Sequence, residues 1–118
     1  MAITKTASDV ASHGWMVSAT SVDFSATEEL RAAPGSGVSI YLEYISINTI
    51  SAITITIGEG ESGNNVVTII VQPVLFTTGG GQYAIHFTRP IKLSAATSLT
   101  VQSSGAGVVQ IVAYGYEE

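Results

Sequence analysis

A chain of 118 residues has the usual size of one domain and can bury roughly two thirds of its unfolded surface in one core. Hydrophobic residues make up 46% of the chain, whereas only 11% of its residues are charged, against about 25% in an average soluble protein. The net charge of −5 comes from nine acidic and four basic residues. Because the basic residues form no cluster, the composition argues against nucleic acid and anionic membranes as partners.

The shortage of charge leaves a surface of Ser, Thr, Gly, Ala, Asn and aliphatic side chains. Such a surface is consistent with partial coverage by neighbours in an assembly, although neutral Ser/Thr-rich β-proteins can also stay monomeric. The chain has no cysteine, which excludes disulfides, zinc-thiolate sites and thiol nucleophiles. The N-terminal residues lack the pattern of a signal peptide, so we expect a soluble protein assembled in the cytoplasm.

The first part of the chain predicts two strands and little helix. Residues 15–24 alternate as a strand whose inward side is uncertain, because both faces are mixed. Residues 26–33 have helix-forming composition for about two turns, but a short strand or connecting arm fits equally well. Residues 38–45 predict a long strand, whose core face is Val38, Ile40, Leu42 and Tyr44.

The middle of the chain predicts a hairpin and an interrupted strand. Residues 51–57 alternate Ile with Ala and Thr, which indicates a strand with one dry face. The loop at residues 58–65 then returns the chain into residues 66–76. Pro73 cannot donate a ladder hydrogen bond, so this segment is expected to split there or to lie at a sheet edge.

The last third predicts four more strands. Residues 82–88 place Tyr83, Ile85 and Phe87 on one face, and Arg89 and Pro90 are expected to end this strand.

Residues 91–93, 98–102 and 108–116 follow as further short strands. The last of these is apolar on both faces, which predicts a central or an interface strand. Residues 1–118 are therefore expected to form a single all-β domain, a β-sandwich with about eight or nine short antiparallel strands.

One pattern in the second half resembles a known class of proteins. The pattern F-x-x-P-I-x-L-x-x-x-T-x-L-x-V is followed by a glycine turn and a Tyr-Gly-Tyr ending, and its residues are Phe87, Pro90, Ile91, Leu93, Thr97, Leu99 and Val101. With the strands from residue 37 onward, it resembles small structural proteins of tailed bacteriophages, such as capsid decoration, cement, head-fibre and tail accessory proteins.

That resemblance implies a jelly-roll-like sandwich that works in the virion as a homo-oligomer, with a trimer favoured. It also implies a phage capsid or tail protein as the partner. Residues 1–12 would then form an extended N-terminal arm that reaches a neighbouring subunit.

The residues that could carry chemistry have simpler explanations. His13 and His86 are the only imidazoles, and no nucleophile-elbow sequence accompanies them, so we expect no enzyme. Glu59, Glu61, Asn64 and Asn65 offer oxygen ligands for calcium, but their spacing fits a solvated hairpin tip better. No metal and no cofactor are expected.

The aromatic residues offer two further interpretations. Trp15 and the five tyrosines either pack in the core and at interfaces, which we expect, or form a platform for sugars in a carbohydrate-binding module. For self-association the strand at residues 108–116 is the candidate. The predicted interface residues are Val112, Tyr114 and Tyr116, because a tyrosine suits a boundary that is apolar at one end and wet at the other.

Overall fold

The structure is a computed structural model that describes residues 3–10, 14–63 and 65–118. These ranges hold nine strands: β1 (Ile3–Val10), β2 (Gly14–Asp23), β3 (Glu28–Arg31), β4 (Ile40–Thr49), β5 (Thr54–Ser62), β6 (Asn65–Leu75), β7 (Gly81–Lys92), β8 (Leu99–Ser103) and β9 (Ala106–Glu117). Within them there is no helix of the length and hydropathy that crosses a membrane. The prediction of an all-β fold is confirmed.

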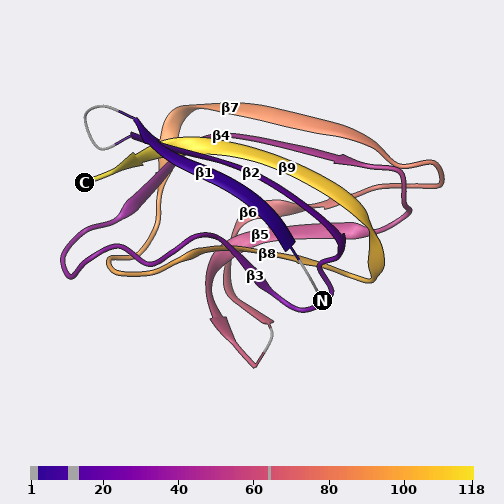
Figure 1. Ribbon diagram of the computed structural model, residues 1–118, viewed down its shortest axis with the longest axis horizontal. Coiled ribbons are helices and arrows are strands. Elements are labelled where there is room, and N and C mark those ends of the chain that lie inside the picture. Colours follow the sequence, from indigo (N-terminus) through magenta and orange to yellow (C-terminus); the bar gives the residue numbers. More distant parts are fainter. Residues whose placement is uncertain (1–2, 11–13, 64) are drawn as a thin grey trace.

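The strands form two antiparallel sheets that face each other. The five-stranded sheet has the order β1-β2-β9-β4-β7, and the four-stranded sheet has the order β3-β8-β5-β6. Figure 1 shows the first sheet as the upper layer and the second as the lower layer. The predicted β-sandwich is therefore confirmed.

The strand order is that of a jelly roll. β2 pairs with β9, β3 with β8, β4 with β7 and β5 with β6, so the chain folds on itself as one long hairpin that wraps around the core. β1 adds a fifth strand to the upper sheet by pairing with β2. Residues 3–10 are thus a strand of this chain's own sheet, while residues 1, 2, 11 and 12 of the expected N-terminal arm lie outside the described ranges.

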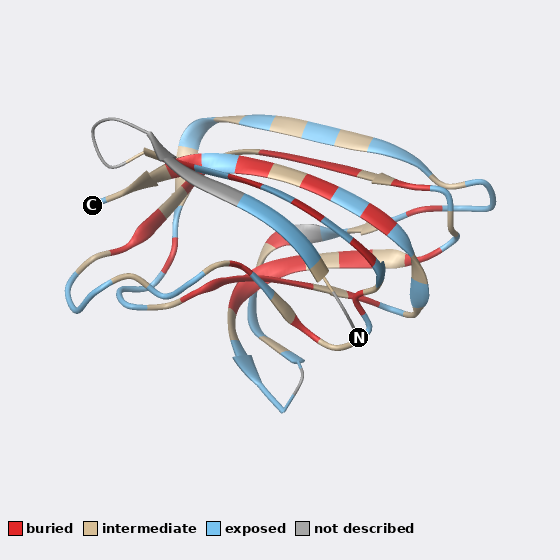
Figure 2. Ribbon diagram, viewed as in Figure 1, coloured by how far each residue is buried: buried red, intermediate tan, exposed pale blue. Residues whose placement is uncertain are grey.

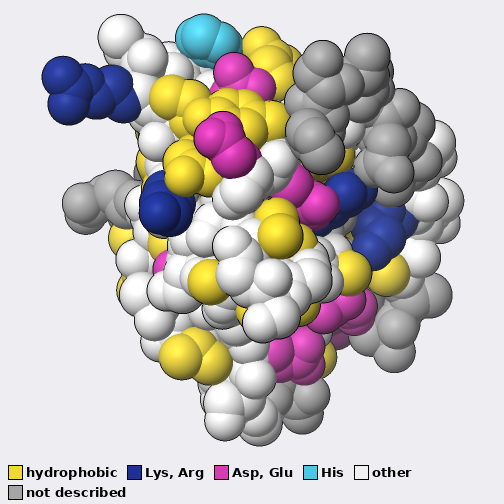
Figure 3. All heavy atoms as spheres, turned by 90° about the vertical axis from the view of Figure 1, so that its left-hand side faces the viewer, with side chains coloured by type: hydrophobic (Ala, Val, Ile, Leu, Met, Phe, Trp, Pro, Cys, Tyr) yellow, Lys and Arg dark blue, Asp and Glu magenta, His cyan; other side chains and the backbone are white. Residues whose placement is uncertain are grey.

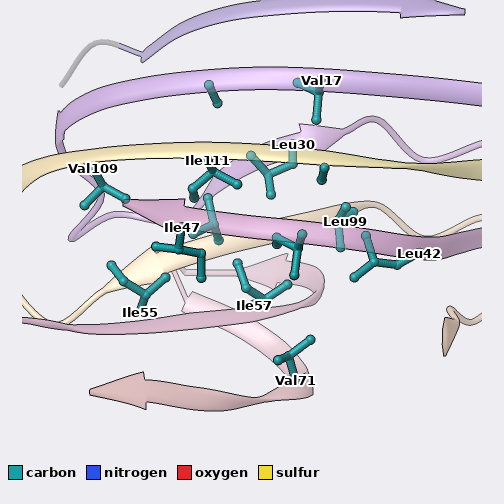
Figure 4. Close-up of a cluster of buried hydrophobic side chains, with 14 of the residues drawn as sticks. Val17, Leu30, Leu42, Ile47, Ile55, Ile57, Val71, Leu99, Val109 and Ile111 are labelled. Carbon is teal, nitrogen blue, oxygen red and sulfur yellow. The ribbon is translucent and has the colours of Figure 1, made fainter. Parts of the chain in front are cut away.

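The core lies between the sheets and follows the two-residue period of the strands. Figure 2 shows buried and exposed residues alternating along β2 and β9. On β2 the inward side, which the sequence left open, holds Trp15, Val17 and Ala19, all buried. Figure 4 shows the aliphatic side chains of both sheets meeting in the middle of the sandwich. The predicted dry face of β5 is confirmed, because Ile53, Ile55 and Ile57 are buried.

A β-bulge in β4 changes the face that the sequence assigned to Tyr44. Leu42 pairs with Gly115 and Tyr44 pairs with Tyr114, so Glu43 is an extra residue on β4. The alternation shifts at that point, and Ile45 is fully buried while Tyr44 is on the outward side. The prediction that Tyr44 faces the core is therefore wrong.

The hairpin between β5 and β6 is tighter than predicted. The strands run to Ser62 and resume at Asn65, so most of the expected loop at residues 58–65 is paired strand. Glu59 is buried, and its carboxylate accepts the Ser94 backbone N–H at 3.1 and 3.3 Å, so the prediction of a solvated tip is wrong for this residue. Glu61 and Asn65 are exposed, as predicted, and Asn64 lies outside the described residues.

Two other segments differ from the sequence prediction in extent. The segment with helix-forming composition contains strand β3, which pairs with β8, so the strand alternative holds. β7 resumes its pairing after Pro90 and runs to Lys92, where a terminus was expected at Arg89. Residues 87–90 leave the ladder, because they stand opposite Glu43 alone. Proline is tolerated there, since a bulged residue needs no ladder hydrogen bond.

Candidate binding face

The outward side of the five-stranded sheet carries two rows of tyrosines across its central strands. The register sets Tyr116 opposite Tyr41, and Tyr41 opposite Lys92. One step along the strands, the row consists of Met16, Tyr114, Tyr44 and His86. We call these two lines of side chains the tyrosine rows, and they occupy one end of the outer face.

The tyrosines are stacked on one another across neighbouring strands. The ring centroids of Tyr41 and Tyr116 are 4.6 Å apart with an interplanar angle of 10°, and those of Tyr44 and Tyr114 are 5.0 Å apart with an angle of 14°. These spacings match the distance of about 4.8 Å between neighbouring strands, so each ring covers one face of the next. The rows therefore present ring edges and hydroxyl groups to solvent more than free ring faces.

A lysine, a methionine and a histidine border the stacked rings. Lys92 Nζ lies 5.9 Å from the Tyr41 ring centroid, on the β7 side of the row. Met16 stands beside Tyr114 on β2, and the His86 ring centroid is 6.4 Å from that of Tyr114. His86 is the one histidine among the described residues. Figure 3 shows hydrophobic and acidic side chains gathered below the cyan histidine.

Gly115 lets the tyrosine row form. A Cβ at this position would lie 1.8 Å from the Tyr41 carbonyl oxygen and 3.2 Å from the Trp15 indole. The bulge at Glu43 thus brings the β4 backbone so close to β9 that only glycine fits between Tyr114 and Tyr116. Sequence and geometry agree here, because the Tyr-Gly-Tyr ending places both tyrosines on one face and the glycine on the other.

An ion pair fixes the end of β9 behind the tyrosines. Arg31 Nε donates to Glu117 Oε2 at 2.7 Å, and the guanidinium lies 5.8 Å from the Trp15 ring centroid. Trp15 Nε1 donates to the Tyr116 carbonyl oxygen at 3.2 Å. These contacts join β2, β3 and β9, so the backbone that carries Tyr116 is held from the core side.

The electrostatic environment of Tyr116 favours its neutral form. Desolvation by burial raises the pKa of Tyr116 above 10.0, and the carboxylates of Glu118 and Glu43 raise it further. Its hydroxyl therefore remains a hydrogen-bond donor throughout the physiological pH range.

The other end of the outer face is polar and uncharged. The register aligns Gln110, Asn48 and Gln82 on three neighbouring strands, and we call them the amide row. They line an open cavity of ≈ 450 Å³ together with Thr49, Ile50, Gly81 and Val108. On each strand the amide row lies four positions, or about 13 Å, from the tyrosine row that contains His86, Tyr44 and Tyr114.

The structure places the three predicted interface residues on this face. β9 is central in its sheet, with Val109, Ile111 and Ala113 buried, and Val112, Tyr114 and Tyr116 on the opposite, outward side. Tyr114 is 36% exposed, and the other two are half-buried. Whether another molecule covers them stays a prediction.

The aromatic residues divide differently from the sequence prediction. The sequence does not place three aromatic residues on one exposed face. The register of β4 and β9 does so, because it brings Tyr41, Tyr44, Tyr114 and Tyr116 together on the outer face. Trp15 is fully buried, and Tyr83 packs half-buried against the core. The amide row was missed for the same reason, since its members come from three strands that only the fold aligns.

Catalytic and metal-binding groups do not gather in the described part of the chain. His86 is exposed beside Tyr114, and among the described residues no hydrogen bond or ion pair joins it to a carboxylate. The other imidazole, His13, lies outside the described ranges. In those ranges no group of three or more His, Cys, Asp or Glu residues is arranged to hold a metal ion.

The comparisons with known proteins give a distant likeness among solved structures. Neither a scan against protein-family models nor a search of curated proteins gives a match. Among solved structures, TmCBM61 in complex with β-1,4-galactotriose, a carbohydrate-binding module, aligns with a TM-score of 0.36 and 17% identity. The alignment covers 90% of this chain but 64% of that one, so this chain spans less than two thirds of that protein's length.

Proposed function

We propose that this chain is a non-catalytic structural protein that works by packing the outer face of its five-stranded sheet against another protein. The observation that carries the proposal is the composition of that face. Its tyrosine rows hold four tyrosines, a methionine, His86 and a single charged residue, Lys92 on the edge strand β7, and its amide row holds no charged side chain. Aromatic residues and methionine are enriched, and charged residues depleted, in the cores of protein interfaces.

The stacked tyrosines suit this use energetically. A tyrosine has few rotatable bonds, and its neighbour in the row already restricts it, so docking costs little side-chain entropy. Burial of the ring edges and of Met16 contributes about 25 cal/mol for each Å² of apolar surface removed from water. The hydroxyls of Tyr114 and Tyr116 can keep hydrogen bonds to the partner or to water at the rim.

The proposed setting is a bacteriophage particle, and it rests on the sequence resemblance alone. In that setting the chain would be a decoration or cement protein of the capsid, or an accessory protein of the tail, assembled in the host cytoplasm. Many copies on a lattice would add their small individual docking energies together. The same resemblance favours a homotrimer, which the mass in solution tests directly.

The experiment for the outer face is a charge placed on β9, in or beside the tyrosine rows. Tyr114→Glu and Val112→Glu put a carboxylate where an interface would exclude water, so each should lower the mass measured by sedimentation at micromolar concentration. Tyr114→Phe, which keeps the ring, is the matched control and should leave the mass unchanged. If both carboxylate variants are folded and keep the wild-type mass, the outer face is not the association surface.

Carbohydrate binding is the second candidate, and the amide row favours it. Three neighbouring amides beside the apolar Val108 and Ile50 line an open cavity, and sugars need such a mixture of hydrogen-bonding and apolar groups. A glycan array with the wild type, Gln110→Ala and Asn48→Ala tests it. Binding that both variants abolish would replace the structural proposal, whereas no saccharide binding by the wild type would remove the candidate.

A further inference from the structure

The two open sheets of the sandwich leave four edge strands, which are β1, β7, β3 and β6. An edge strand presents unpaired backbone N–H and C=O groups, and another strand can pair with them. Proteins prevent this pairing with charged side chains, proline, bulges or very short edge strands. The four edges of this sandwich differ in how many of these devices they have.

Two edges carry charges. β3 is four residues long and contains Glu28, Glu29 and Arg31. β1 contains the exposed Lys5. A charged side chain on an edge loses its water when another strand pairs beside it, so these charges disfavour strand addition at both edges.

The third edge, β6, is broken by its geometry. Ile55 pairs with Val74 and Ile57 with Val71, so Gln72 and Pro73 oppose a single residue of β5. Ile70 is a second extra residue, because Val71 and Ile69 pair with consecutive residues of β5. Bulges bend and twist a strand, and proline cannot donate, so no flat ladder can extend from this stretch.

The tip of β6 is also tied to the body of the protein. The Val66 backbone N–H donates to Gln102 Oε1 at 3.3 Å, and Gln102 Nε2 donates to Asn65 Oδ1 at 3.0 Å and to the Ser25 carbonyl at 3.1 Å. Gln102 thus occupies a backbone donor of β6 that a partner strand would otherwise use.

The fourth edge, β7, has none of these devices over its first half. Its register with β4 is regular from Gly81 to His86, and residues 81–88 include no Asp, Glu, Lys, Arg or Pro. Figure 1 shows β7 as the outermost strand of the upper layer, and Figure 2 shows exposed and half-buried residues alternating along it. Its inward side chains Tyr83, Ile85 and Phe87 are only half-buried.

We propose that the edge of β7 pairs antiparallel with β7 of a second copy of this chain, which joins two five-stranded sheets into one continuous sheet. The inference rests on the proposed function, because it names the partner and a surface of an assembling protein, but it replaces the homotrimer that the resemblance favours by an even-numbered assembly. A second copy fits for two reasons. An antiparallel two-fold pairing is self-complementary, and two chains of net charge −5 approach most closely where neither has a charged side chain.

Pairing at β7 would also complete two other features. It would cover the half-buried Tyr83, Ile85 and Phe87 at the open side of the sandwich. It would also join the two outer faces, because in an antiparallel pair centred near Ala84 the Gln82 of one copy stands beside His86 of the other. The amide row of each copy would then continue into a tyrosine row of its neighbour.

Single cysteines test the pairing, because the chain has none of its own. Opposite residues of an antiparallel pair have Cα atoms about 4.5–5.5 Å apart, within the range of about 4.4–6.8 Å that a disulfide spans. Three variants are made, Gln82→Cys, Ala84→Cys and His86→Cys. Under mild oxidation, either one of these variants by itself or a mixture of two of them should form a disulfide-linked dimer. Leu75→Cys on β6 and Val22→Cys on β2, which replace residues that are 73% and 64% exposed, are the controls.

The outcomes separate this inference from the proposed function. Cross-linking confined to the β7 variants, with loss of wild-type mass in Ala84→Lys, supports the pairing. Cross-linking at Leu75→Cys or Val22→Cys to the same extent overturns it, as does a wild type that is purely trimeric, since a two-fold contact gives even-numbered assemblies. If the β7 variants stay uncross-linked while Tyr114→Glu still lowers the mass, the β7 pairing fails and the outer face stands.

Discussion

β6 and β7 are consecutive edge strands on the same open side of the sandwich, yet their sequences and geometries suggest opposite behaviour. β6 has the more apolar sequence, and Val67, Ile69 and Leu75 on it are exposed. β7 alternates polar and apolar residues as an ordinary strand does. By composition alone β6 would be the edge that attracts other strands, but its two bulges, Pro73 and the Gln102 contacts interrupt the ladder.

The difference shows that backbone regularity decides which edge can accept a strand. A partner strand needs several consecutive free donors and acceptors in one plane, and β7 supplies them from Gly81 to His86. The exposed aliphatic residues of β6 can be covered by other contacts, but they do not extend the sheet. Four sets of substitutions test the parts of this comparison, and they are given in order of expected effect.

The largest effect is expected in the core that supports both edges. Leu42 on β4 lies behind β7 and Ile55 on β5 lies behind β6, and both are fully buried. Leu42→Ala and Ile55→Ala should each lower the free energy of unfolding by about 2–5 kcal/mol, because each leaves a cavity. Urea unfolding followed by the fluorescence of the buried Trp15 measures it. Thr54→Ala and Thr56→Ala on the outward side of β5 should cost far less, and equal losses at both sets would contradict the register.

The next effect concerns the fold-back of β6 over β5. A Cβ on Gly58 would lie 2.2 Å from Val66 Cγ1 and 2.3 Å from the Thr68 carbonyl oxygen, so Gly58→Ala must push β6 outward. We expect a loss of about 1–3 kcal/mol, typical of overpacking, and more aggregation as the β6 edge is freed. Gly35→Ala is the control, since nothing lies within 4 Å of a Cβ there. If Gly58→Ala and Gly35→Ala are equally stable, β6 does not lie so close to Gly58.

A smaller effect is expected at Gln102. Gln102→Ala removes the hydrogen bonds to Val66, Asn65 and Ser25. The free energy of unfolding should fall by about 0.5–1.5 kcal/mol for each of these bonds that water does not replace. The amide hydrogen of Val66 should then exchange faster with solvent. Gln110→Ala, on the outer face, is the matched control and should leave that exchange rate unchanged. An unchanged rate in Gln102→Ala would mean that the β6 edge is protected by its bulges alone.

The smallest effect is a pH dependence at the loop that Gln102 contacts. Hydrogen bonds from Ser25, including its backbone N–H to Asp23 Oδ1 at 2.8 Å, lower the pKa of Asp23 below 3.8. A lowered folded-state pKa means that the stabilisation is present above pH 3.8 and is lost as the pH falls through the folded pKa. Asp23→Asn should therefore flatten the acid limb of the stability curve, as thermal unfolding from neutral to acidic pH would show. A curve that keeps its shape in this variant would assign the acid limb to other carboxylates.

Much of the fold follows from the residue alternation. Ile53, Ile55 and Ile57 face the core, and Tyr83, Ile85 and Phe87 share the inward side of β7, as the two-residue period predicts. The misassigned face of Tyr44 has a different origin. The bulge at Glu43 arises where β4 meets β9, so it depends on a partner strand that the local sequence does not specify.

The candidate face was predicted only in part. The outward position of Tyr114 and Tyr116 follows from the alternation in β9, and the sequence names them for that reason. Their stacking on Tyr44 and Tyr41 depends on the alignment of two distant strands. The amide row depends on three such strands, and the order of edges in the sandwich depends on all nine. No periodicity within one segment carries that information.

The nested strand pairing has a consequence for how the protein is made. β9 lies between β2 and β4, and Trp15 bonds to Tyr116 across 101 positions of sequence. During synthesis the central position of the five-stranded sheet therefore stays empty until β9 has left the ribosome, and such long-range closure is slow. Until then β2 and β4 are two more unpaired edges beside the core side chains. Without β9, β1 and β2 are not joined to β4 and β7, so a nascent chain exposes these strand edges until β9 is available.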